Sequence, residues 1–260
     1  MSTTVVRDVG TPYPFSVLGV QVNALETVNV TWEMERWIAK RDRCHFVACT
    51  GMHGIAEAQL DPSFKEVLNS ADLVVADGMP LVWLARRHGF DLRRRVYGPR
   101  LLEKFCCNSG RFYRHYFYGG APGVAERVSA YMERYNVHTV GAYSPPFRPL
   151  TEQEKVEADR RIEDAAPDVL WVGLSTPKQE RWMYEHRSRL PVPVMVGVGA
   201  AFDFFSGRVK QAPLWMQENG LECVYRLIQE PRRLWRRYLV LGPMFAWNVS
   251  LELLGLRKYE

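Results

Sequence analysis

The sequence of 260 residues has few cysteines, and none of them are paired by spacing. Five cysteines, an odd number without a CxxC motif, argue against a disulfide framework and a structural zinc site and favour a reduced, cytoplasmic protein. The chain also lacks HExxH spacing and any Asp-x-Asp pair, so no motif calls for a bound metal. The cysteines are Cys44, Cys49, Cys106, Cys107 and Cys223.

Long apolar runs are missing as well. Residues 1–10 lack the basic segment and apolar run of a secretory signal peptide. A membrane-spanning helix needs about 18–20 uninterrupted apolar residues. The most apolar stretch, residues 238–256, could lie on a membrane but is a poor candidate to cross one. Four residues interrupt it: Gly242, Pro243, Asn248 and Glu252.

Two nucleotide-binding motifs are absent. The chain contains neither a Walker phosphate loop nor a complete GxGxxG, which counts against an ATPase or a dinucleotide-dependent dehydrogenase. Its 47% apolar and 24% charged residues are average for a soluble globular protein, which makes disorder or coiled coil a poor interpretation.

The positive charge of the chain is concentrated near its C-terminus. The net charge is +5, and residues 226–237 alone hold five arginines against Glu230, a local charge of +4. Such a cluster predicts an anionic partner: a phosphate, an anionic lipid or a nucleic acid.

Short apolar runs alternate with helical patterns over the first 200 residues. This alternation predicts an α/β fold with a mostly parallel sheet and helices on both faces. We expect a catalytic core over residues 1–200, with residues 1–40 as an N-terminal extension. The expected strands are 45–50, 73–77, 115–118, 139–143, 169–173 and 194–198, and the expected helices are 54–69, 79–88, 122–135, 151–165 and 177–189.

The pattern changes after Val198. Residues 201–260 are expected to form an arginine-rich appendage, helical from Pro213 onward, with breaks at Pro231 and at Gly242-Pro243. This segment also contains several aromatic residues. Its basic cluster could instead be a solvated helix whose aromatic side chains pack on the core.

Ligands of such sheets bind beyond the carboxyl ends of the strands, so polar residues at these ends are the candidates. Thr50, followed by His53, ends the first core strand, although a threonine there could simply cap a helix. Asp77-Gly78 ends the next strand; Asp77 could be a general base, or a turn or cap residue. Gly119-Gly120 opens a helix and could admit a phosphate, but glycine-rich turns are common.

Three further strand ends carry candidates. Tyr143 ends the strand expected over 139–143. The segment 173–180 has helix-start chemistry and places Lys178 and Gln179 over the crevice, whereas Glu180 could be a plain capping-box partner. Asp203 lies between aromatic residues, which suits a carboxylate that meets a ligand or caps a turn.

Taken together, these segments resemble the WecG/TagA/CpsF glycosyltransferases of bacterial surface-polysaccharide synthesis. The resemblance runs from about Cys44 to Tyr238. Its most specific blocks are GLSTPKQERWM (173–183) and VPVMVGVGAAFDFFSGRVKQAPLWMQENGLECVYRLIQEPRRLWRRY (192–238).

The resemblance implies a Rossmann-like core and a C-terminal appendage that completes the active site and contacts the membrane. It implies an inverting, metal-independent transfer from a UDP-sugar to a polyprenyl-diphosphate-linked acceptor, with no cofactor, on the inner membrane face. The donated sugar would be N-acetylmannosamine, its uronic acid or glucose. Homo-oligomerisation is left open.

Family roles carry over onto matching residues. The resemblance implies that Asp77 is the catalytic base and that Asp203 lies near uracil. The appendage arginines would close over the diphosphate. The implied substrate-binding residues are Thr50, Arg95, Gln179, Asp203, Arg226, Arg233 and Arg236 or Arg237.

The chain departs from the family pattern twice. Many members have Thr-x-Asn after the first strand, where this chain has Met52 and then His53. His53 could substitute as a polar contact. Many members also carry an acidic residue where this chain has Arg100, a change that could alter the donor sugar.

Two other functions compete with this interpretation. A Rossmann-type oxidoreductase acting on nucleotide sugars would need bound NAD, and the missing GxGxxG speaks against it. An arginine-rich nucleic-acid-binding module would predict salt-dependent binding of oligonucleotides. We rank that module last and expect no nucleic acid, because the arginines lie beside an α/β nucleotide fold rather than along a recognition helix.

Overall fold

An eight-stranded, mostly parallel sheet forms the centre of the molecule in the computed structural model, which describes residues 14–218 and 220–259. The strand order is β1-β2-β4-β3-β8-β7-β5-β6, and among these eight described strands only the β1–β2 pair is antiparallel. The predicted α/β fold with a mostly parallel sheet is confirmed. The strands are β1 (Pro14–Val17), β2 (Val20–Asn23), β3 (His45–Thr50), β4 (Leu73–Ala76), β5 (His115–Gly119), β6 (Thr139–Tyr143), β7 (Val169–Gly173) and β8 (Val194–Gly197).

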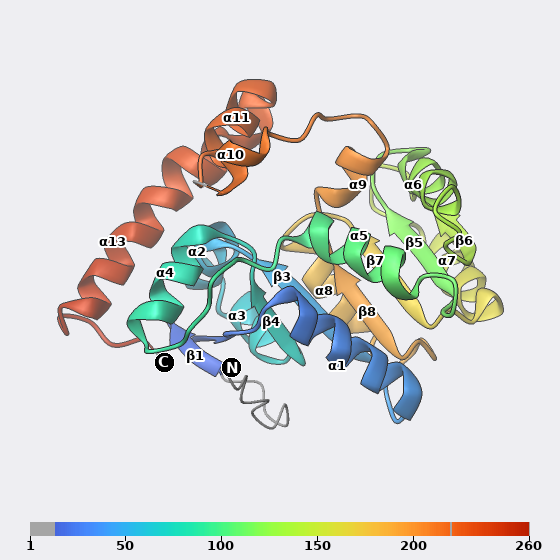
Figure 1. Ribbon diagram of the computed structural model, residues 1–260, viewed down its shortest axis with the longest axis horizontal. Helices are drawn as coiled ribbons and strands as arrows, with labels where there is room; N and C mark the ends of the chain where they lie inside the picture. The colour runs from blue at the N-terminus through green and yellow to red at the C-terminus, as the bar shows by residue number, and fades with distance from the viewer. Residues whose placement is uncertain (1–13, 219, 260) are drawn as a thin grey trace, which may run out of the picture.

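Helices cover both faces of this sheet (Figure 1). Every residue of β3, β4, β5, β7 and β8 is buried, as expected for parallel strands with two covered faces. The helices of the core are α1 (Thr27–Lys40), α2 (Met52–Leu60), α3 (Pro62–Asn69), α4 (Met79–Arg87), α5 (Gly98–Ser109), α6 (Val124–Glu133), α7 (Glu152–Ala165), α8 (Lys178–His186) and α9 (Ala201–Phe205).

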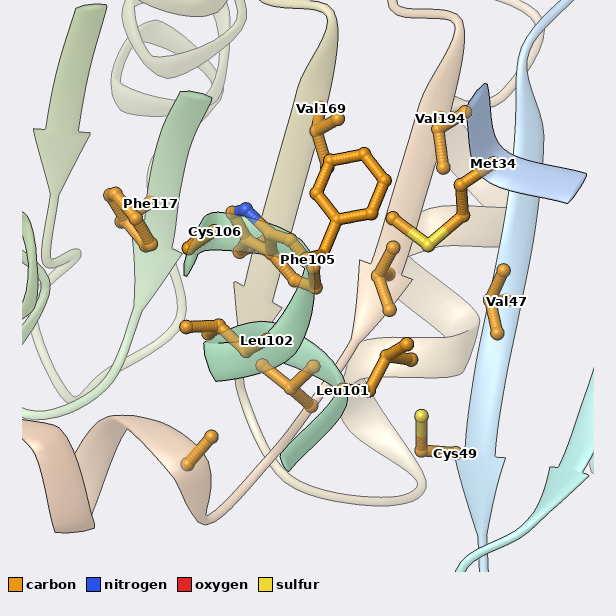
Figure 2. Close-up of a cluster of buried hydrophobic side chains, with 14 of the residues drawn as sticks. Met34, Val47, Cys49, Leu101, Leu102, Phe105, Cys106, Phe117, Val169 and Val194 are labelled. Carbon is orange, nitrogen blue, oxygen red and sulfur yellow. The ribbon is translucent and has the colours of Figure 1, made fainter. Parts of the chain in front are cut away.

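The largest buried cluster lies between the sheet and helices α1, α5, α6 and α9. Figure 2 shows Phe105, Leu101 and Leu102 of α5 lying across β7 and β8, with Met34 of α1 beside Val47 of β3. Two further clusters fill the space under α2, α3 and α4 and under α7 and α8. These layers hold the carboxyl ends of the strands in fixed positions.

The observed helices differ from the predicted ones in two places. The helix predicted over 54–69 is two helices, because Asp61 accepts a hydrogen bond from the Phe64 amide and Pro62 begins a new helix. Helix α5 was not predicted, although Pro99 stands in its first turn, where proline is favoured. The helix expected from Thr151 is confirmed, with Thr151 and Glu154 forming a capping box.

The N-terminal residues contribute to the core. Of the extension expected over 1–40, residues 1–13 lie outside the described residues. Residues 14–40 supply the antiparallel β1–β2 pair at the sheet edge and helix α1. Asn23 of β2 pairs with β4, and its side chain accepts a hydrogen bond from the Val74 amide.

The arginine-rich appendage folds back over one edge of the core. In Figure 1 its helices lie beside α2 and α4. Helix α9 belongs with the core, since Ala201 and Phe202 pack into the largest cluster. The remaining helices are α10 (Leu214–Glu218), α11 (Glu222–Gln229), α12 (Pro231–Trp235), the wider π-helical segment η1 (Arg236–Leu241) and α13 (Gly242–Leu253).

One of the two helix breaks predicted for this segment is wrong. The chain does break at Glu230, before Pro231. It remains helical through Gly242-Pro243, however, because the wide turns of η1 come directly before Pro243, which lacks an amide donor and stands in the first turn of α13. Phe245 and Val249 of α13 are buried in the cluster that contains α2. Within the described residues, every helix is too short or too polar to span a bilayer.

Candidate active site

Two cavities open near the carboxyl ends of the strands. The connection after β5 leads to β6 on one side, and the connection after β7 leads to β8 on the other, so a topological switch point lies between β5 and β7. A small cavity of about 150 Å³ lies at the ends of β3 and β4, under the appendage. A large cavity of about 870 Å³ lies at the ends of β5 and β7.

Asp77 lines the small cavity. It follows the last residue of β4, and its backbone amide donates to the Thr50 carbonyl at the end of β3, which fixes both strand ends. One carboxylate oxygen, Oδ1, is buried and has no hydrogen-bond partner. Burial raises the pKa of Asp77 from 3.8 to about 7, against the opposing effects of Arg95, Arg237 and a hydrogen bond from the Gly98 amide. A carboxylate with such a pKa and a free oxygen suits a general base near neutral pH.

Arg95 is held beside Asp77 by a residue that was not predicted. Its guanidinium forms a salt bridge with Glu222 at the start of α11, and it stacks over the Tyr97 ring at 4.1 Å. The Tyr97 hydroxyl donates to Glu222 Oε1 at 2.6 Å. Glu222 is only 6% exposed, so this carboxylate ties the appendage to the core through two partners.

Helix α11 has its polarity reversed relative to an ordinary surface helix. The two charged residues Glu222 and Arg226 are each 6% exposed and line the small cavity. The apolar residues of the same helix face outward: Val224 is 48% exposed and Ile228 is 76% exposed. The charged face of α11 therefore lines the small cavity, whereas Val224 and Ile228 of its apolar face are exposed.

Two arginines and a histidine complete the small cavity. Nε of Arg226 and Nε of Arg237 are buried without a hydrogen-bond partner, which leaves donors available for an anion. Burial lowers the pKa of His53 far below 6.5, and Arg237 and Arg226 lower it further, so its imidazole is neutral. Burial also lowers the pKa of Arg237.

A layer of buried polar side chains lies beside the cavities. Thr50, Gln179 and Glu180 are each at most 2% exposed, and each has an oxygen without a hydrogen-bond partner. Gln179 Nε2 and the Thr176 hydroxyl both donate to Glu180 Oε1, at 3.0 and 2.8 Å. Burial raises the pKa of Glu180. A side chain at Gly54 would place its Cβ 2.0 Å from Thr50 Oγ1, so this position requires glycine.

Four predicted residues line the large cavity: Gly120, Lys178, Asp203 and Arg233. Gly120 adopts a φ of +79° and, like Lys178, lines the wall, while Gly119 packs closely on Gly173. Asp203 of α9 is 7% exposed and accepts a hydrogen bond from Arg233 of α12 at 3.1 Å. Arg233 and Arg237 lie one turn apart on the continuous helix, so the appendage supplies a cation to each cavity.

Three further residues named from the sequence lie outside both linings, as Thr50, Gly119, Gln179 and Glu180 do. Tyr143 lies on the edge strand β6 against Arg161 of α7. Arg236 is exposed, so Arg237 is the member of that pair that reaches the small cavity. Arg100 is also exposed and lies outside both linings. In the described part of the chain, no group of three or more His, Cys, Asp and Glu side chains is arranged to hold a metal ion.

A mostly parallel α/β sheet with a carboxylate and several guanidinium groups beyond the carboxyl ends of its strands has the layout of a site that suits an anionic ligand. The family described as "Glycosyl transferase WecG/TagA/CpsF family" matches residues 15–259. The chain belongs to this family of glycosyltransferases, which confirms the resemblance.

Two relatives carry the same name, N-acetylglucosaminyldiphosphoundecaprenol N-acetyl-beta-D-mannosaminyltransferase. The protein of Bacillus spizizenii is 35% identical over 185 residues, 70% of each chain. That of Bacillus subtilis strain 168 is 32% identical over 197 residues, covering 74% of this chain and 73% of the relative.

Proposed function

We propose that this protein transfers a sugar, with inversion, from a UDP-sugar to a polyprenyl-diphosphate-linked acceptor, and that N-acetylmannosamine is the sugar. The names of the two Bacillus relatives support this sugar and a GlcNAc-diphosphoundecaprenol acceptor. The observation that carries the proposal is the Asp77 carboxyl group, which faces a small cavity among arginines with an unpartnered oxygen.

The reaction is a single displacement. The acceptor hydroxyl attacks the anomeric carbon while Asp77 takes its proton, and the bond from that carbon to the diphosphate oxygen breaks. UDP leaves with the bonding electron pair. One attack from the face opposite the leaving group inverts the anomeric configuration, and it needs one base rather than a nucleophilic carboxylate.

Guanidinium groups would meet the charge of the departing UDP. Arg226 and Arg237 have buried donors without partners, and Arg233 lies at the edge of the large cavity. The planar fork of arginine suits phosphate oxygens, and burial strengthens each contact. We assign the uridine to the large cavity beside Asp203, with the diphosphate reaching toward the arginines of the small cavity, where the acceptor hydroxyl meets Asp77.

The apolar face of α11 supports an association with the membrane that carries the acceptor. Val224 and Ile228 face outward on α11, and Trp235, Leu239 and Trp247 are 52%, 62% and 66% exposed on the helices that follow. Exposed arginines such as Arg232 and Arg236 lie on the same appendage. Apolar side chains with basic neighbours are typical of helices that rest in an anionic membrane surface. The location would be peripheral, on the cytoplasmic face.

One experiment tests the reaction directly. The purified full chain is given a panel of UDP-sugars together with a short-chain GlcNAc-diphospholipid, and release of UDP is measured. We expect UDP-N-acetylmannosamine to release UDP only when the acceptor is present. We also expect NMR of the product to show an inverted anomeric configuration. No acceptor-dependent release from any donor in the panel would overturn the proposal.

A further inference from the structure

We propose that Glu222 is a positioning residue: it holds the Arg95 guanidinium and keeps that positive charge from forming an ion pair with Asp77. This inference rests on the proposed function, in which Asp77 is the base. It assigns to the appendage a part in setting the proton affinity of the base, beyond supplying arginines to the diphosphate.

The placement of Glu222 carries the inference. Its carboxylate is buried between Arg95 and the Tyr97 hydroxyl, and all three residues line the small cavity together with Asp77. Stacking of Arg95 over the Tyr97 ring at 4.1 Å and the salt bridge with Glu222 together hold the guanidinium in its present orientation. The appendage and the segment after α4 therefore meet at one charged contact, next to the proposed base.

Removing the carboxylate of Glu222 would leave a buried cation uncompensated. Arg95 already lowers the pKa of Asp77 and Glu222 raises it, so the two charges offset one another at the base. Without Glu222, the Arg95 guanidinium would form an ion pair with Asp77, because a buried charge without a partner is strongly destabilising. Asp77 would then be ionised at lower pH and would be a weaker base.

The other charged groups of this region are placed differently. Glu180 accepts from Thr176 and Gln179, and Arg226 lies 3.6 Å from Glu230. The Nε of Arg237 has no partner, and its charge also lowers the pKa of Asp77. The titratable and charged side chains facing this region are Cys49 from β3, His53 from α2, Arg95 and Tyr97 from the segment after α4, Glu180 from α8, Glu222, Cys223 and Arg226 from α11, and Arg237 and Tyr238 from η1.

The test replaces Glu222 by glutamine, which keeps the shape and removes the charge. A neighbouring opposite charge lowers the pKa of an aspartate by about 1–3 units. We therefore expect the acid limb of the kcat/KM profile to shift to lower pH by about one unit. We expect kcat to fall about tenfold, with the donor KM changed less than about threefold, because the weaker base acts on the chemical step.

Three further variants separate this role from a structural one. Glu222→Asp restores the charge and is expected to return the acid limb to its wild-type position. Adding Arg95→Gln to Glu222→Gln removes both charges and is expected to return the limb as well. Glu230→Gln is the matched control: it also removes an appendage carboxylate bonded to an arginine, and its acid limb should stay in place.

A substrate-free readout keeps the inference distinct from the proposed function. The ionisation of Asp77 is followed by ¹³C-carboxyl NMR, and we expect a lower midpoint in Glu222→Gln than in the wild type. An unchanged midpoint in that folded variant would overturn the role of Glu222. A shifted midpoint in an enzyme that releases no UDP would instead leave the role standing and reject the reaction.

Discussion

The guanidinium of Arg233 lies 3.1 Å from the carboxylate of Asp203, joining the appendage helix α12 to the core helix α9 at the edge of the large cavity. Arg208 lies 3.6 Å from the same carboxylate. Asp203 therefore has two cationic partners, and Arg233 can turn to an incoming phosphate without leaving Asp203 uncompensated. This contact is the second place where the appendage meets the core through opposite charges.

Replacing Arg233 by alanine is expected to lower kcat/KM for the donor by about 10²-fold, as for the loss of one transition-state charge stabiliser. Steady-state kinetics of UDP release measure it. The neighbouring Arg232 is exposed and lines neither cavity, so Arg232→Ala is the matched control and should stay within about threefold of wild type. Equal losses in both variants would reject a specific role for Arg233.

Asp77→Asn is expected to reduce turnover at least about 10³-fold, because an amide cannot take the acceptor proton. Its circular dichroism should match that of the wild type. The variant should also be more stable at pH 8. Burial raises the pKa of the native carboxyl to about 7, so the stability associated with the protonated form is lost as the pH rises through 7. After allowing for the partial exposure of Asp77, we expect the free energy of unfolding of the variant, measured with urea at pH 8, to be about 2 kcal/mol higher than that of the wild type. Near-wild-type turnover would remove Asp77 as the base.

The pH profile of the wild type follows from the same group. Below pH 7 most of the Asp77 carboxyl is protonated and unable to act as a base. We expect kcat/KM for the acceptor to fall about tenfold per pH unit below 7 and to level off above it. A flat profile between pH 5 and 8 would contradict this expectation.

Ile228→Glu is expected to weaken partitioning onto phosphatidylglycerol vesicles about tenfold, because burial of an isoleucine side chain contributes about 1.5–3 kcal/mol. Sedimentation with vesicles measures it. Val156 of α7 is also exposed, at 61%, and lies away from the appendage, which makes Val156→Glu the control. Point substitutions are preferable to deleting residues 226–260, since Phe245 and Val249 are buried in the core. A wild-type protein without vesicle affinity would reject the membrane contact.

Chelation is the test of metal independence. Treatment with EDTA, followed by assay with and without added Mg²⁺, is expected to change UDP release less than about twofold, because arginines would carry out the charge neutralisation that a metal supplies elsewhere. Complete loss of turnover that Mg²⁺ restores would show that the guanidinium groups do not suffice.

Much of the fold follows from local sequence patterns. β3, β6 and β7 were predicted with their observed bounds, because each is a short run of β-branched and aromatic residues next to turn residues. The β1–β2 pair, α1 and α5 were not predicted. In α5 the Gly98-Pro99 pair has the composition of a turn, and only packing of Phe105 and Leu101 on the sheet selects the helix.

The candidate site was predictable only in part. Residues at strand ends, such as Asp77 and Gln179, could be found because a parallel sheet brings its carboxyl ends together. Glu222 and Tyr97 could not, since they lie on segments far apart in the chain. The spacing of Glu222, Arg226 and Ile228 indicates an amphipathic helix. The ordinary rule buries the apolar face of such a helix, however, and would therefore have placed Ile228 inside and the two charged residues outside.

The reversed polarity of α11 has a practical consequence for anyone who redesigns this protein. The usual way to improve solubility is to replace exposed aliphatic residues by lysine or glutamate and to keep the charged residues. Applied to α11, it would spare Glu222 and Arg226 but alter Val224 and Ile228, the side chains that we propose to rest on the membrane, and the more soluble protein would be expected to lose access to its lipid-linked acceptor.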